Sequence, residues 1–399
     1  MSALPFPARR VLLWCLTLLL ASCTDPYLPP AITSPPNYLV VDGFINSQGV
    51  TTIRLSRTYA IASGATSPVE SKATLAIEDE AGVRYALREG VSGTYISTAL
   101  TLNTTRKYRL HINTLTGKEY VSDFMPVKTT PPIDKVNWRV ENTGLSIYVN
   151  AHDPANATQY YRWETEETWE INPVYRPNIE YVNGKIRDIV TPYPTLCWGT
   201  VRSPVVRIYK TTALSQDVVA DFRVQQLPAN SERLNTRYSI LVQQHALSKE
   251  EFAYWELLRK NTESIGTLFD PQPAQVTGNV RCLSNTAEVA LGFVSTHSLT
   301  ESRIFIRKTE LPQTLQVLNG YEDCMPPDTV YIDRPIYPAP PSAADIVALL
   351  YAAFANPAVT VPITTLYNNN KVVAGYTAKS RDCVDCRRRG TTVKPSFWP

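Results

Sequence analysis

The sequence predicts a mainly β protein made of two β-sandwich domains, the second with one or two helices and a disulfide-linked C-terminal segment. Among its 399 residues are 22 tyrosines and 31 prolines, a composition that favours strands joined by irregular loops. Short alternating segments separated by turn signals recur roughly every 8 to 12 residues, as in sandwiches. Only one segment carries a clear helix signal.

Residues 1–22 are predicted to be a lipoprotein signal peptide. Two arginines precede the apolar run Val11–Leu20, which is shorter than the roughly 20 residues needed to span a bilayer. The following L-A-S-C resembles a bacterial lipobox, so Cys23 is expected to be lipidated after cleavage. The alternative is an ordinary secretory signal with a chance cysteine.

Residues 23–37 are predicted to form an extended, proline-rich tether between the lipid and the folded protein. No other apolar run approaches about 20 residues, so the lipid is the expected membrane attachment. The full chain has 39 basic and 36 acidic residues. Removal of the signal peptide with its two arginines leaves 37 basic and 36 acidic residues, a balance that gives no electrostatic reason to expect nucleic-acid binding.

The first sandwich is predicted over residues 38–128. "NYLVVDGFINS" and "VTTIRLSRTYA" have the composition and alternation of strands. Two hairpins are expected, one turning at residues 80–82 and one at Thr116-Gly117. The alternation that starts at Tyr108 resembles the corner tyrosine of immunoglobulin- or fibronectin-like sandwiches.

The second domain is predicted over residues 129–399, after the proline-rich boundary "MPVKTTPPIDKVNW". Trp163 and Tyr238 repeat the sandwich pattern on later strands. An S-x-x-E capping box begins a helix expected at about 248–264. The apolar stretch after Ser342 is a candidate second helix.

A long loop over residues 171–200 is a candidate binding loop, because aromatic side chains dominate interface hot spots. Its aromatic candidates are Tyr175, Tyr181, Tyr193 and Trp198. The alternative is that these rings fold back over the second domain, with Cys197 fixing the loop.

Two disulfides are expected after export, because oxidising compartments favour them. The candidates are Cys197, Cys324, Cys383 and Cys386, with Cys282 the expected spare. The sequence leaves open which cysteines pair. Zinc and redox chemistry are the less favoured alternatives for the C-V-D-C motif, and no metal or cofactor is predicted.

No catalytic motif is present, and the four histidines lack metal-binding spacing. Glu164 and Glu166 share one face of a predicted strand, where acid–base work or calcium binding competes with a plain exposed sheet face. The arginines at 387–389 are a candidate anion site or, preferentially, partners of Asp382 and Asp385. We therefore expect a protein that is not an enzyme.

Three stretches support a family resemblance: the lipobox followed by "YLVVDGFIN", "ALSKEEFAYWELL" leading to "LFDPQPAQVTGNV", and the ending "CVDCRRRGTTVKPSFWP". Together they resemble the DUF4249 lipoproteins of Bacteroidota over essentially the whole mature chain. The C-V-D-C-R block is the most specific element, and Gly390-Thr391 replaces an expected double glycine.

The resemblance implies an outer-membrane lipoprotein, exposed at the cell surface in preference to the periplasmic face, that assists a TonB-dependent receptor in nutrient uptake. It supplies no catalytic residues, and the ligand stays open. The alternatives are a structural envelope lipoprotein and a surface hydrolase with an unrecognised site.

Overall fold

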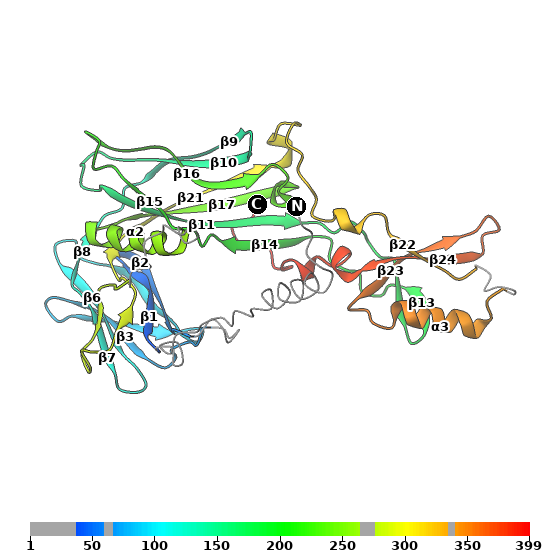
Figure 1. The fold of residues 1–399 in the computed structure, drawn as a ribbon, viewed down its shortest axis with the longest axis horizontal. Coiled ribbons are helices and arrows are strands. Elements are labelled where there is room, and N and C mark those ends of the chain that lie inside the picture. Colours follow the sequence, from blue (N-terminus) through cyan, green and yellow to red (C-terminus); the bar gives the residue numbers. More distant parts are fainter. Residues whose placement is uncertain (1–36, 60–66, 264–275, 334–339) are drawn as a thin grey trace, which may run out of the picture.

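The structure is a computed structural model that describes residues 37–59, 67–263, 276–333 and 340–399. The predicted signal peptide, Cys23 and nearly all of the tether lie outside these residues. Figure 1 shows three parts: a first sheet, a sandwich beside it, and an extension that projects from one end of the sandwich. No helix in the described ranges has the length and apolar character needed to cross a membrane.

The first sheet closes on itself through eight strands. β8 pairs with β6 on one side and with β20 on the other, and β20 runs parallel to β1. In order around the sheet the strands are β6 (Lys107–Asn113), β3 (Thr74–Asp79), β4 (Arg84–Glu89), β5 (Thr94–Thr101), β2 (Gln48–Arg57), β1 (Leu39–Asn46), β20 (Thr296–His297) and β8 (Met125–Lys128). Three more strands attach to it: β7 (Glu119–Ser122), β18 (Val280–Cys282) and β19 (Ala290–Leu291).

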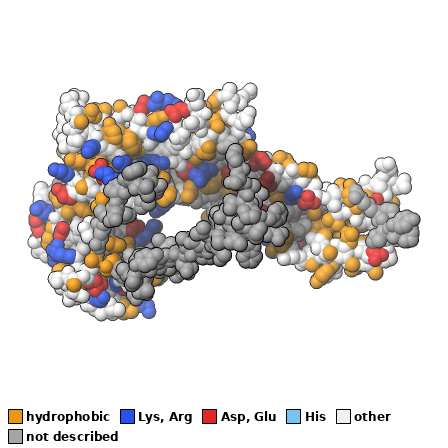
Figure 2. Space-filling view, in the orientation of Figure 1, with side chains coloured by type: hydrophobic (Ala, Val, Ile, Leu, Met, Phe, Trp, Pro, Cys, Tyr) orange, Lys and Arg blue, Asp and Glu red, His pale blue; other side chains and the backbone are white. Residues whose placement is uncertain are grey.

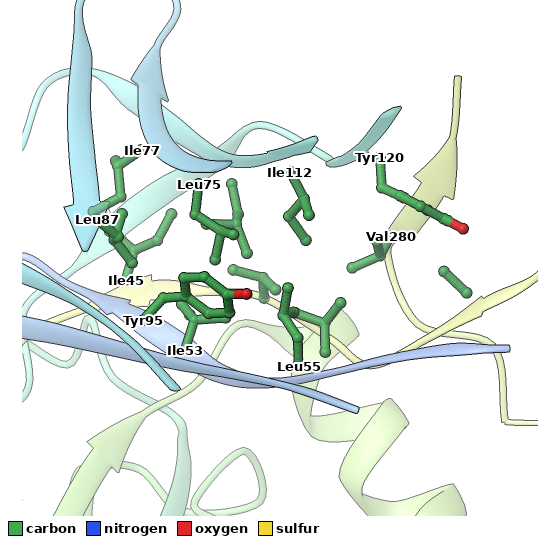
Figure 3. Close-up of a cluster of buried hydrophobic side chains, with 14 of the residues drawn as sticks. Ile45, Ile53, Leu55, Leu75, Ile77, Leu87, Tyr95, Ile112, Tyr120 and Val280 are labelled. Atoms are coloured by element: carbon green, nitrogen blue, oxygen red, sulfur yellow. The ribbon is translucent and has the colours of Figure 1, made fainter. Parts of the chain in front are cut away.

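The closed sheet corrects the prediction of a first sandwich. Both predicted hairpins are present, as β3–β4 and β6–β7, but the closing strand β20 lies far later in the chain than residues 38–128. Figure 3 shows Val280 in the same core as Leu75 and Tyr120. Alternation of apolar and polar residues identifies individual strands, but it carries no information on which distant strands pair. The pairing of β20 with β1 and β8 was therefore not predictable from the sequence.

The sandwich consists of two sheets that share one apolar core. One sheet contains β9 (Ile133–Glu141), β10 (Gly144–Asp153) and β16 (Asp217–Pro228). The other contains β11 (Tyr160–Ile171), β14 (Cys197–Arg202), β15 (Arg207–Lys210), β17 (Arg237–Ala246) and β21 (Leu299–Arg307). Trp163 of β11 stacks on Phe222 of β16 with centroids 4.6 Å apart, and Tyr238 is buried between the sheets. Both rings therefore occupy the core positions that the sequence predicts.

Helix α2 (Lys249–Glu263) covers the β11–β15 side of the sandwich, facing the first sheet (Figure 1). It starts as predicted, because the Ser248 hydroxyl accepts a hydrogen bond from the Glu251 amide at 3.1 Å. Phe252 is buried against Tyr160 and Ile208. Short 3₁₀ helices complete the connections: η3 (Glu232–Leu234), η4 (Lys308–Glu310), η5 (Glu322–Cys324), η6 (Arg381–Cys383) and η7 (Cys386–Arg388).

The extension is built from two segments far apart in the chain. It contains the hairpin β12 (Ile179–Val182) and β13 (Lys185–Asp188), the sheet β22 (Asp328–Tyr331), β24 (Val373–Ser380) and β23 (Thr360–Tyr367), and helix α3 (Ala343–Phe354). Ser342 caps α3 as expected for a helix start. Figure 2 shows hydrophobic side chains gathered over this part, and Val347 and Tyr351 of α3 are exposed.

Candidate ligand-binding cleft

A cleft of about 650 Å³ lies where the first sheet, the sandwich and α2 meet. Strands β1 and β2, strands β11 and β17, the 202–207 segment and α2 all contribute to its lining. Its lining includes Asp42, Gly43, Phe44, Arg54, Arg162, Glu164, Arg202, Val205, Val206, Arg207, His245, Glu251, Tyr254, Trp255 and Phe293. Junctions of this kind are preferred ligand sites, since two rigid parts enclose a space that neither encloses alone.

Phe44 is held at the cleft by the local shape of β1. Gly43 has φ +130°, and a Cβ atom there would lie 2.4 Å from the Thr52 carbonyl oxygen of β2. Only glycine tolerates both conditions. The Phe44 ring stacks on His297 with centroids 4.2 Å apart and meets His245 edge-on at 5.1 Å.

The two histidines beneath Phe44 are buried and uncharged. Burial, together with the positive charge of Arg162, lowers the pKa of His297 to about 3 and that of His245 well below its ordinary value. Nδ1 of His297 donates to the Ser298 carbonyl oxygen at 3.2 Å. Within the described ranges, neither His245 ring nitrogen has a hydrogen-bond partner, although Nε2 lies 3.9 Å from a Glu164 oxygen.

Arg162 forms one wall of the cleft and connects β11 to α2. Its guanidinium carbon lies 4.1 Å from the centre of the Trp255 ring, a cation–π contact that strengthens when shielded from water. Its Nη1 donates to Glu164 at 2.5 Å. The wall is therefore prearranged before any ligand enters.

Glu251 places a second carboxyl group in this wall. The side chain is buried, and this burial raises its pKa to about 7, while the nearby Arg162 acts in the opposite direction. Trp255 Nε1 lies 3.4 Å from Glu251 Oε1. Near neutral pH, Glu251 is thus only partly ionised, and it can donate or accept a hydrogen bond.

The arrangement is suited to binding more than to acid–base chemistry. Glu164 is engaged by Arg162, and Glu166 lies near Arg202 and Arg303 on the same outer face of the sheet. The alternation that the sequence predicts for these two glutamates is therefore seen, with both committed to ion pairs. No group of three or more potential metal ligands occurs in the part of the chain that the structure describes.

Among the cysteines that the structure describes, Cys197 is bonded to Cys386 and Cys324 to Cys383, and Cys282 is free and buried. These links use the four cysteines predicted to pair. The first disulfide joins the start of β14 to η7, and the second joins η5 to η6. Together they hold the root of the extension in place.

The four aromatic side chains of the candidate binding loop lie in the packed extension and sandwich edge. Tyr175 donates to the Cys324 carbonyl oxygen at 3.0 Å, and Tyr181 packs on Phe354 of α3. Tyr193 packs against an apolar cluster formed by Val361, Ile363 and Val384. Trp198 is buried within β14. This arrangement corresponds to the alternative in which the segment folds back, with Cys197 fixing it. The prediction of one long loop is wrong, because residues 171–200 contain the β12–β13 hairpin and the start of β14.

The three C-terminal arginines contact nearby acidic groups. Arg387 pairs with Asp385 at 2.8 Å and Arg388 with Asp382 at 3.0 Å. Arg389 lies 3.4 Å from Glu232. This is the ion-paired arrangement that the sequence analysis preferred to an anion site.

The family comparison matches residues 24–303 to the model described as "Domain of unknown function (DUF4249)". The chain belongs to the DUF4249 family. The match contains every residue of the cleft. It ends within β21, so the terminal C-V-D-C-R block, which the sequence analysis took as the most specific element of the resemblance, lies outside the matched region.

Two solved structures show weak similarity. A segment of two fibronectin type III domains from chicken tenascin is 12% identical, with a TM-score of 0.17, and the alignment covers 52% of this chain and 91% of that chain. The BSP domain of a biofilm-associated protein is 7% identical, with a TM-score of 0.13, and covers 86% and 76% respectively. Scores this low support no inference about function. No curated protein matches the sequence.

Sequence reasoning missed the cleft, because its residues come from five separate segments. The sequence carries only faint signals of it: Arg162 is a charged residue between two aromatic ones, and Glu251 is recognisable only as the last residue of the S-x-x-E capping box. His245 and His297 lie far apart in the chain and show no motif spacing, although their ring centroids are 5.1 Å apart in the fold.

Proposed function

We propose that this protein is a lipid-anchored accessory protein of the outer membrane that binds a ligand in the cleft and serves a TonB-dependent receptor. The cleft is the observation that supports binding: about 650 Å³ of space lined by aromatic rings and charged groups that are already positioned. Preorganised walls reduce the entropy lost when a ligand binds.

The anchoring part of the proposal rests on the basic pair, the short apolar run and L-A-S-C at Cys23. The receptor, the outer membrane and exposure at the cell surface rest on the family resemblance. Shared family membership supplies biological context without a mechanism, so these parts need direct experiments.

A substitution tests the anchor. Cys23→Ser should leave an unlipidated precursor, or a product missing from detergent-extracted membranes, because the thiol is the acceptor of the lipid. Cys15→Ala, which changes a cysteine outside L-A-S-C, serves as the matched control for expression. Normal membrane attachment of the Cys23→Ser protein would contradict the proposal.

Two further measurements test binding against its alternatives. Lipidated protein purified from solubilised outer membranes should bring a TonB-dependent receptor with it. Envelope defects without any uptake phenotype would instead favour a structural role. Substrate turnover that is lost in Glu164→Gln or Glu166→Gln would favour a hydrolase and overturn the proposal.

A further inference from the structure

Buried polar atoms without hydrogen-bond partners lie in the lining of the cleft. Arg162 and His245 stand opposite each other in the β11–β17 register, and both line the cleft although each residue is more than nine-tenths buried. Among the described residues, Nε of Arg162 and both ring nitrogens of His245 have no hydrogen-bond partner. Native proteins rarely leave buried polar groups unpaired, because each one lowers the stability of the fold. We therefore looked for a guest that pairs with them.

The hydrogen-bonding capacity of these atoms is mixed. Nε of Arg162 can only donate. Burial lowers the pKa of His245 well below its ordinary value, so the ring is neutral, and one of its nitrogens donates while the other accepts. Glu251, in the same lining, is partly protonated near neutral pH because burial raises its pKa to about 7. A hydroxyl group both donates and accepts at one atom, so a guest with neighbouring hydroxyl groups matches this set.

The charges that border the cleft are balanced. Three arginines of the lining have acidic neighbours: Arg162 pairs with Glu164, Arg202 pairs with Glu166, and Arg54 stands opposite Asp42 in the β1–β2 register. The Arg207 side chain points toward the sandwich core, where its Nη2 donates to Gln225 of β16 at 2.8 Å. The lining therefore offers little net charge to attract a charged guest.

Aromatic rings also line the cleft. Phe44 comes from β1, Tyr254 and Trp255 come from α2, and Phe293 comes from the segment before β20. All four side chains are half-buried, and the rings of Tyr254 and Phe293 lie 5.6 Å apart. The electron-rich face of such a ring attracts weakly positive C–H groups. A sugar presents C–H groups on one side and hydroxyl groups along its edge, whereas a purely apolar guest would leave the polar atoms unpaired.

We infer that the cleft binds a neutral sugar, whose hydroxyl groups pair with Nε of Arg162 and the ring of His245 while its C–H face packs against the aromatic rings. This inference rests on the proposed binding function and specifies the class of its ligand. The volume of about 650 Å³ lies within the range of small-molecule sites, roughly 300–1,000 Å³. It therefore favours a short saccharide.

A printed array of mono- to hexasaccharides tests the inference with full-length protein. The array carries neutral sugars beside their sulfated and carboxylated forms, so it separates hydroxyl recognition from charge. The protein should bind neutral sugars, and an added sulfate or carboxylate should not tighten binding. A folded protein that binds none of the neutral sugars, or only acidic ones, would overturn the inference.

His245→Phe tests the polar contact, because it removes both ring nitrogens and keeps an aromatic ring beside Phe44. Binding of neutral sugars should weaken at least about tenfold, the ratio that about 1.4 kcal/mol gives. The melting temperature should stay the same or rise, since an apolar ring replaces unpaired polar atoms. His245→Gln retains a donor and an acceptor and should keep more of the binding. Equal sugar binding by wild type and folded His245→Phe would contradict the inference.

A matched control uses the same substitution at a histidine outside the cleft. His152 of β10 is exposed, so His152→Phe should leave sugar binding within about twofold. If His245→Phe does not fold, the comparison of His245→Gln with Trp255→Leu takes its place. Trp255→Leu removes part of the aromatic wall and should weaken sugar binding more than His245→Gln does. Sugar binding that neither variant weakens would overturn the inference.

Displacement of a dye locates the binding site. 1-Anilinonaphthalene-8-sulfonate binds accessible apolar surface, so it should bind against the aromatic rings of the cleft and be displaced by the sugars that bind on the array. Val347→Ser with Tyr351→Ser removes exposed apolar surface from α3 in the extension and should leave sugar binding within about twofold. Sugar binding that is lost in this α3 variant and kept in Trp255→Leu would overturn the inference.

The outcomes also separate this inference from the proposed function. If the dye binds to wild type and is lost in Trp255→Leu, but no neutral sugar displaces it, the cleft still binds ligands and the sugar class is wrong. Co-purification with a TonB-dependent receptor tests the proposed function by itself, whatever the array shows.

Discussion

The first sheet buries its apolar side chains in one continuous core, whereas the extension divides them among three small clusters. Both disulfides in the described chain lie at the root of the extension, and the closed sheet holds a free cysteine, Cys282, within its core. Small apolar clusters bury too little surface to offset chain entropy, so covalent links take a larger share of the stabilisation.

This difference also separates the two parts by function. The first sheet and the sandwich enclose the cleft, and all of its residues lie within the family match. The extension begins with the 172–196 segment but is mostly built from residues after 303, where the match ends. We therefore expect ligand binding to depend on the first sheet and the sandwich, and to tolerate changes in the extension.

The largest predicted effect comes from removing a cross-link. Cys197→Ser with Cys386→Ser opens a link across 189 residues, and the chain-entropy model gives such a link about 5 kcal/mol. The extension should then unfold in a separate, earlier transition. Cys282→Ala is the matched control outside the disulfides and should cost much less.

Hydrogen exchange assigns this transition to a part of the molecule. In the double cysteine variant, α3 and β22–β24 should lose protection while β1 to β6 keep theirs. A single transition in which the extension and the first sheet lose protection together would contradict the separate unfolding of the extension.

Glu251 provides a prediction of intermediate size within the cleft. Its pKa is raised from 4.5 to about 7, so the stability that it contributes is full below about pH 4.5 and is lost as the pH rises through about 7. Each pKa unit corresponds to about 1.4 kcal/mol, which predicts a change of about 3 kcal/mol. Arg162 from β11 is the charged group that faces it.

The comparison of wild type with Glu251→Gln isolates this contribution. The unfolding free energy of wild type should fall by about 3 kcal/mol relative to the variant between pH 4 and pH 8. The two buried histidines titrate in both proteins, so their effect cancels in the difference. A pH-independent difference would contradict this, because it would show that the pKa of Glu251 is the same in the folded and the unfolded protein.

Tyr175 gives the smallest predicted effect. Tyr175→Phe removes only the hydrogen bond to the Cys324 carbonyl oxygen, worth about 1 kcal/mol. Tyr175→Ala also removes half-buried ring contacts beside the disulfides and should cost more. Neither variant should weaken association with a receptor, and a loss of association at an unchanged melting temperature would restore the binding-loop hypothesis.

The sequence predicts the features that depend on neighbouring residues. The hairpins at residues 80–82 and 116–117, the helix start at Ser248 and the core rings Trp163 and Tyr238 all follow from local alternation, turns and caps. The mainly β class follows from the same signals.

The features that depend on distant residues could not be predicted in this way. Closure of the first sheet needs β20 to reach β1 and β8, and the cleft needs Phe44 to meet His245 and His297. The odd cysteine count predicted two disulfides and one spare thiol, while the pairing depends on where the fold places η5, η6 and η7.

Hydrogen exchange of the full-length protein, with and without saturating 1-anilinonaphthalene-8-sulfonate, tests the central claim most directly. The cleft account predicts added protection in residues 41–54, 160–167, 202–208 and 243–256, which contribute its walls. Protection confined to residues 172–196 and α3, with these segments unchanged, would contradict it.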